Sequence, residues 1–78
     1  MDVNATGRVI HALAALRDSD GNVQVAAVNL GISKETLLRA LAEVGPKFYE
    51  ELGDGRILPT PMGLRFADRV GTFPYVNW

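Results

Sequence analysis

The chain contains no cysteine and only one histidine in its 78 residues. Without thiols, neither a disulfide nor a thiolate metal site can hold the fold together. The lone His11 has no ligand partner at a suitable spacing, and it cannot build a nucleophilic set with a third, orienting group. We therefore expect no enzyme, no metal and no cofactor, and we expect the hydrophobic core alone to provide stability.

Long hydrophobic runs are also missing. No apolar segment approaches the roughly 20 residues that a membrane-spanning helix needs. The first residues, MDVNATGRVI, lack the basic start and apolar stretch of a secretory signal. Because cysteine-free chains are typical of reducing compartments, we expect a soluble cytoplasmic protein with no membrane partner.

The chain also has no surplus of positive charge. Eight Lys and Arg stand against nine Asp and Glu, for a net charge of −1. Domains that bind nucleic acid through its phosphates are usually more basic. The distribution of charge over the folded surface matters more than the sum, so this composition weakens a nucleic-acid hypothesis without excluding it.

The hydrophobic pattern predicts one small domain over residues 1–78, with a first helix over residues 5–17 that Asn4 or Thr6 caps. The stretch 22–44 predicts a helix, a tight turn and a second helix. Asn22 caps the first of these helices, Gly31 ends it in the left-handed conformation, and Ser33 caps a helix over 33–44. Within that last helix Leu37, Leu41 and Val44 share an inward face, at spacings of four and three residues.

The downstream residues predict a β-hairpin and a closing helix. Strands over 47–52 and 56–58 flank the loop Gly53-Asp54-Gly55, so that a wing spans 47–59. Thr60 and Pro61 start a helix over 61–70, and a short aromatic tail follows over 72–78. The expected fold class is mainly α with a small β-hairpin, a winged helix-turn-helix with a three- to four-helix core and a two-stranded wing.

Three stretches resemble the amino-terminal DNA-binding domain of LysR-type transcriptional regulators and of the related molybdate-responsive ModE type. They are AAVNLGISKETLLRAL (26–41), GDGR (53–56) and LPTPMG (58–63). This resemblance implies double-stranded DNA as the partner, with helix 33–44 in the major groove and the wing on the DNA backbone. Transferred by position, the DNA-facing residues are Ser33, Lys34, Glu35, Leu38, Arg39 and, in the wing, Arg56.

Each of these residue types suits such a contact. Arg39 can pair with guanine or a phosphate, and Glu35 can accept from cytosine. Ser33 can offer its hydroxyl and neighbouring N–H groups to a phosphate. Leu38 stands where the family usually carries a polar serine, so it can touch a thymine methyl or belong to a protein-binding surface. Arg65 and Arg69 are expected to be plain surface residues.

The chain departs from the family in lacking its linker helix and effector domain. We therefore expect a free-standing reader with no small-molecule effector, acting as a homodimer or higher oligomer. The aromatic tail, with Phe73, Tyr75 and Trp78, has three interpretations: it completes the domain's own core, forms a self-association surface, or docks another protein.

The alternative function is a protein-interaction module, a small modulator of a partner protein that uses Leu38 and the aromatic tail. Charge placement discriminates between the two hypotheses. A continuous positive band from Lys34 through Arg39 to Arg56 favours DNA, whereas a mixed or apolar patch favours a protein partner.

Overall fold

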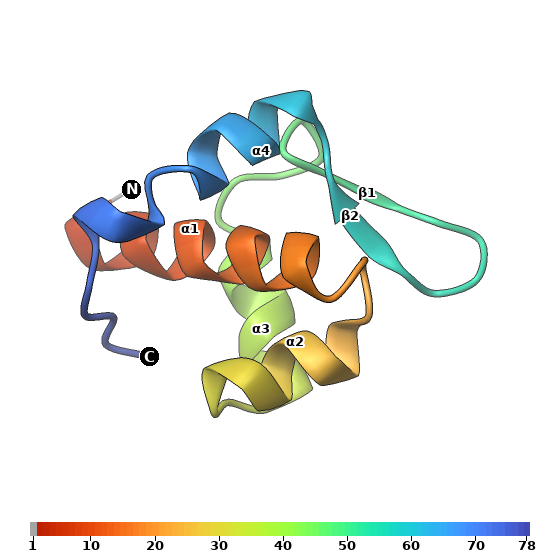
Figure 1. Cartoon of the computed structure of the whole chain (residues 1–78), viewed down its shortest axis with the longest axis horizontal. Coiled ribbons are helices and arrows are strands. Elements are labelled where there is room, and N and C mark those ends of the chain that lie inside the picture. The colour runs from red at the N-terminus through yellow and green to blue at the C-terminus, as the bar shows by residue number, and fades with distance from the viewer. Residues whose placement is uncertain (1) are drawn as a thin grey trace.

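The structure, a computed structural model, describes residues 2–78 and confirms the expected fold class: mainly helical, with one two-stranded antiparallel hairpin in a winged-helix-like arrangement (Figure 1). The elements in chain order are α1 (Val3–Asp18), α2 (Val23–Leu30), α3 (Lys34–Leu41), β1 (Tyr49–Glu51), β2 (Ile57–Pro59), α4 (Pro61–Ala67) and the 3-10 helix η1 (Val70–Thr72).

Helix α1 lies at the centre of the molecule, with α4 on one side of it and α2 and α3 on the other (Figure 1). Its buried residues occur on nearly every face of the helix rather than along one stripe. A helix that is apolar all round is one that other elements surround. Many of these buried positions are alanines, which let the neighbouring helices approach closely: Ala5, Ala12, Ala14 and Ala15.

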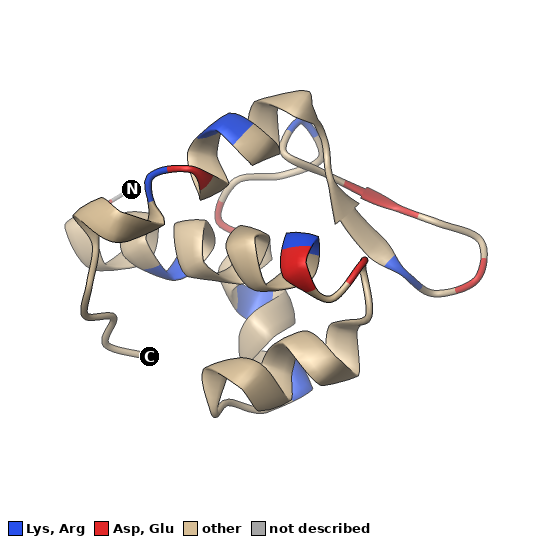
Figure 2. Ribbon diagram, in the orientation of Figure 1, with Lys and Arg blue, Asp and Glu red and all other residues tan. Residues whose placement is uncertain are grey.

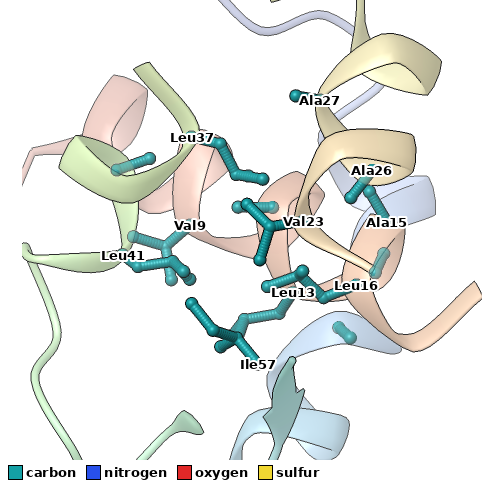
Figure 3. Close-up of a cluster of buried hydrophobic side chains, with 14 residues drawn as sticks. Val9, Leu13, Ala15, Leu16, Val23, Ala26, Ala27, Leu37, Leu41 and Ile57 are labelled. Atoms are coloured by element: carbon teal, nitrogen blue, oxygen red, sulfur yellow. The ribbon is translucent and has the colours of Figure 1, made fainter. Parts of the chain in front are cut away.

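A single hydrophobic core joins the elements, as Figure 3 shows. From α1 the side chains of Val9, Leu13 and Leu16 enter it, each fully buried. Leu37 and Leu41 reach it from α3, Val23 from α2 and Ile57 from β2. Burying one such aliphatic side chain stabilises the fold by about 1.5–3 kcal/mol, so α3 and the hairpin are both anchored on α1.

The predicted caps inside the chain are confirmed. The side chains of Asn22, Ser33 and Thr60 accept hydrogen bonds from the backbone N–H three residues on, at 3.1, 3.1 and 3.2 Å. Gly31 has a φ of 71° at the end of α2, the left-handed conformation that glycine adopts without steric cost.

The start of α1 was predicted wrongly. The helix begins at Val3 rather than at residue 5, and its cap is neither Asn4 nor Thr6. Asp2 takes that place, because its carboxylate accepts a hydrogen bond from the N–H of Ala5 at 2.7 Å. A carboxylate at this end also interacts favourably with the helix dipole.

Two helices end earlier than predicted. Helix α3 ends at Leu41 instead of residue 44, and the N–H groups of Glu43 and Val44 bond to carbonyls three residues back, both at 3.2 Å. Helix α4 ends at Ala67 instead of residue 70, and η1 follows it. Tightened last turns of this kind satisfy the free carbonyls of a helix end.

The hairpin strands have three residues each and pair Tyr49 with Pro59 and Glu51 with Ile57. The first strand is shorter than the predicted 47–52, and the second is shifted by one residue from the predicted 56–58. The second strand ends at Pro59, as expected of a residue without an N–H. On its other edge, the N–H of Ile57 donates to the carbonyl of Gly21 at 3.0 Å. This bond fixes the wing against the turn between α1 and α2.

Helix α4 packs against the chain that enters β1. The rings of Phe66 and Phe48 lie 5.3 Å apart between centroids, and the N–H of Thr60 donates to the Phe48 carbonyl at 3.1 Å. A Cβ atom at Gly63 would overlap that same carbonyl oxygen. The absence of a side chain at Gly63 therefore permits this close approach.

We predict that Gly63→Ala destabilises the protein by about 1–3 kcal/mol or more, because the new methyl group has to push the Phe48 backbone away. This cost outweighs the roughly 1 kcal/mol by which alanine is the better helix former. Urea unfolding followed by circular dichroism measures the change. The matched control is Gly53→Ala, since open space surrounds a Cβ there. Equal midpoints for the two variants would contradict the proposed contact.

Candidate nucleic-acid interface

Helix α3 exposes all five of the residues that the sequence placed on its reading face. Ser33, Lys34, Glu35, Leu38 and Arg39 are exposed, whereas Leu37, Ala40 and Leu41 are buried in the core. Leu38 is 37% exposed, a large apolar side chain open to solvent on this face. The helix is therefore held rigidly from behind while these side chains remain free to meet a partner.

The exposed face of α3 has two flanks, because successive residues point about 100° apart around a helix. Lys34 lies on the flank toward the wing and Arg39 on the flank toward α1. Each flank borders a shallow hollow. The wing-side hollow, of about 280 Å³, is lined by Gly21, Asn22, Val23, Gln24, Lys34, Asp54, Gly55 and Arg56. The α1-side hollow, of about 230 Å³, is lined by Arg8, Thr36, Arg39, Ala40, Glu43 and Trp78.

In the wing-side hollow, carboxylates hold the guanidinium of Arg56. Its Nε lies 2.8 Å from Asp54 Oδ2, and its Nη1 lies 3.5 Å from Asp20 Oδ2. The N–H of Arg56 also donates to Asp54 Oδ1 at 3.1 Å. The structure thus brings Lys34 and Arg56, two of the residues expected to face DNA, to the same hollow, but the charge of Arg56 is balanced by two acidic residues.

These hydrogen bonds lower the pKa of Asp54. The backbone N–H of Arg56 is the largest cause, and the hydrogen bond from its side chain is the second. The ionised carboxylate therefore stabilises the hairpin tip above the ordinary pKa of 3.8. Because the folded-state pKa is the lower one, this contribution disappears as the pH falls below 3.8 through that lowered value.

The α1-side hollow contains Arg8, a basic residue that the sequence did not indicate. Its Nη1 donates to the carbonyl of Asn77 at 2.9 Å. Ion pairs within residues 2–78 involve only Arg17 and Arg56 as cations, so Arg8, Lys34 and Arg39 have no carboxylate partner there. No local pattern could have identified Arg8, because its place beside Arg39 depends on how α1 crosses α3.

The aromatic tail folds back over α1, but Phe73, Tyr75 and Trp78 are not among the residues of the hydrophobic core. Phe73 and Val76 lie over Gly7, where a Cβ would sit 3.3 and 3.6 Å from their side-chain atoms. His11 Nε2–H donates to the carbonyl of Phe73, which gives the lone histidine a structural role. Trp78 ends at the α1-side hollow, whereas Tyr75 is 92% exposed.

The charges around α3 do not form one continuous positive band. Lys34 and Arg39 lie on different flanks, with Glu35 and Leu38 exposed beside them. Figure 2 shows acidic residues along the hairpin and at the end of α1, close to basic ones. Positive charge without a paired carboxylate lies on both flanks of α3 and on the adjoining part of α1, and Lys47, Arg65 and Arg69 carry more of it elsewhere in residues 2–78.

Comparisons of the chain with protein-family models, with curated proteins and with solved structures find no match. In the part of the chain that the structure describes, no helix is long and apolar enough to cross a membrane. Residues 2–78 also hold no group of three or more His, Cys, Asp or Glu side chains that could bind a metal ion. The function is therefore inferred from the surface of this chain itself.

We predict that Arg56→Ala raises the pKa of Asp54 but does not restore its ordinary value. The variant loses the side-chain hydrogen bond and keeps the backbone N–H, which is the larger cause of the shift. Carboxyl-carbon NMR titration of both proteins measures the difference. Arg65→Ala, an exposed α4 residue, is the control and leaves the titration of Asp54 unchanged. An identical titration in wild type and Arg56→Ala would contradict the hydrogen-bond geometry.

Proposed function

We propose that this protein binds double-stranded DNA as a transcriptional regulator, with α3 in the major groove. The observation that supports this proposal most is that α3 has one buried face and one exposed face. Its buried face is fixed in the core, and its exposed face presents Lys34 and Arg39 without paired carboxylates. The likeness to LysR-type and ModE-type domains in the turn between α2 and α3 supports the same proposal.

The dimensions of α3 suit this role. An α-helix with its side chains is about 10–12 Å across, and the major groove, about 12 Å wide, admits it. Arg39 has the length and the donor fork to reach a guanine edge or a phosphate. Glu35 can accept from cytosine, and Leu38 can pack on a thymine methyl.

Ser33 acts differently from a free contact residue, because its hydroxyl oxygen already accepts the N–H of Thr36 at 3.1 Å. It also shares a hydrogen bond of 2.9 Å with the Thr36 hydroxyl. Its main contribution to DNA binding is thus to hold the first turn of α3 in shape. The neighbouring backbone N–H groups remain available to a phosphate.

A single module of this size reads few base pairs, since isolated DNA-binding modules bury only about 600–1,000 Å² of surface. Two copies on a twofold site multiply the contacts and fix the half-site spacing. The proposed regulator therefore acts as a homodimer or higher oligomer. At the wing, the pairing of Arg56 with Asp54 and Asp20 competes with a phosphate contact.

Binding of another protein is the second candidate function, and one observation favours it. The positive charge around α3 is interrupted, and Leu38 and Tyr75 are 37% and 92% exposed. These two residues are suitable anchors for a protein partner. The candidates differ in their response to salt, because only phosphate contacts release counterions. Undetectable duplex binding at about 50 mM salt would favour the protein partner.

We predict that Arg39→Ala weakens binding to a target duplex, selected from a random pool, by about 1–3 kcal/mol if Arg39 reads a base. Fluorescence anisotropy across a salt series measures this loss for the target and for random duplexes. Equal loss from both assigns Arg39 to a phosphate instead. Arg65→Ala on α4 removes the same charge far from α3 and is the control. Unchanged affinity in Arg39→Ala would count against the proposal.

We predict that Asp54→Asn strengthens DNA binding and steepens its salt dependence. The asparagine oxygen can still accept the Arg56 N–H and preserve the turn, but it carries no charge. Asp20 alone then balances the guanidinium, which binds a phosphate more readily. The slope of log K against log salt should become more negative by up to about 0.9 for each phosphate gained. Asp68→Asn removes an equal charge from the end of α4 and serves as the control. A slope that matches wild type would show that Arg56 stays away from DNA.

A further inference from the structure

The α1-side hollow brings two cations from different elements to one place. Arg8 comes from α1 and Arg39 from α3, and both line the hollow together with Thr36. Neither guanidinium has a carboxylate partner among residues 2–78. Both residues therefore offer positive charge to one hollow, where an anion that contacts both is attracted by each.

The side chain of Arg8 is held in place before any ligand arrives. It is half-buried, and its Nη1 donates to the Asn77 carbonyl at 2.9 Å. This bond uses one of its five donors and leaves its charge unbalanced. Because the guanidinium is already oriented, less conformational entropy is lost when its remaining donors bind an oxyanion.

The surroundings of the hollow favour a singly charged phosphodiester over a more highly charged anion. Glu43 also lines the hollow, so two positive groups face one negative group. The Thr36 hydroxyl can donate a hydrogen bond to a phosphate oxygen. Trp78 also lines the hollow, and Figure 1 shows the tail passing from η1 across the start of α1 toward the side where α3 lies.

We infer that Arg8 and Arg39 form a binding site for a DNA backbone phosphate, on the flank of α3 that faces away from the wing. This inference rests on the proposed function and adds Arg8 to it. The phosphate belongs to the DNA strand that borders the major groove on the α1 side. The main contact of the domain with the DNA backbone is then made by α1 and α3, because the guanidinium of Arg56 in the wing is already paired with Asp54 and Asp20.

The test compares Arg8→Gln and Arg8→Lys with wild type in duplex binding across a salt series. Glutamine keeps a polar side chain with hydrogen-bond donors but has no charge, whereas lysine keeps the charge. We expect Arg8→Gln to reduce the magnitude of the salt slope by about 0.9 and to weaken target and random duplexes by the same factor. We expect Arg8→Lys to keep the wild-type slope. Arg65→Gln, an exposed residue of α4, is the matched control for loss of charge.

One further variant and one further probe make each outcome decisive. Trp78→Ala disturbs the tail without changing charge, so an equal slope change in this variant would assign the effect to the tail and overturn the inference. Inorganic phosphate, followed by NMR of the arginine Nε–H signals, tests the other source of the same anion. Loss of a phosphate-induced shift in Arg8→Gln, with duplex binding unaltered, would overturn the DNA assignment in favour of free phosphate.

The failure of this inference is distinguishable from the failure of the proposed function. If wild type binds duplex DNA and Arg8→Gln retains both affinity and slope, the subsite is wrong and the function stands. If wild type binds no duplex at about 50 mM salt, both are wrong. Matching urea midpoints for wild type and Arg8→Gln are required to show that the variant is folded.

Discussion

The burial of α1 on nearly all its faces is the constraint on which the rest of the structure depends. Its aliphatic and alanine side chains contact α2, α3, α4 and β2. Each of the other helices is short, with seven or eight residues, and such helices are marginal in water without tertiary packing. They are therefore stable because α1 provides an apolar surface for each of them, and their orientation follows from how they pack on it.

This arrangement also determines where charge is available on the surface. The turn after α1 places Asp20 beside the wing, where it and Asp54 hold Arg56. The opposite flank of α3 meets the face of α1 that carries Arg8. The net charge is −1, yet one flank of α3 carries guanidinium groups without a carboxylate partner and the other carries a guanidinium balanced by two carboxylates. The net charge alone does not reveal this difference between the two flanks.

Local signals predicted much of the fold. The caps at Asn22, Ser33 and Thr60 depend on a side chain that bonds to the backbone three residues on. The turn at Gly31 depends on the left-handed conformation that glycine adopts easily. Both are local, so the sequence pattern alone identifies them. The errors fell at the element ends. Asp2 was overlooked as a cap although its role is equally local, whereas the early ends of α3 and α4 reflect how the chain turns to pack against the core.

By itself the sequence determined the element types, their order, the turn chemistry and the exposed face of α3, because helix periodicity and capping act over a few residues. Only the tertiary structure decided which charges meet. The pairing of Arg56 with Asp20, the approach of Arg8 to Arg39 and the return of the tail to α1 join residues 36, 31 and about 65 positions apart. Contacts at such separations depend on the crossing of packed helices, which no local pattern specifies.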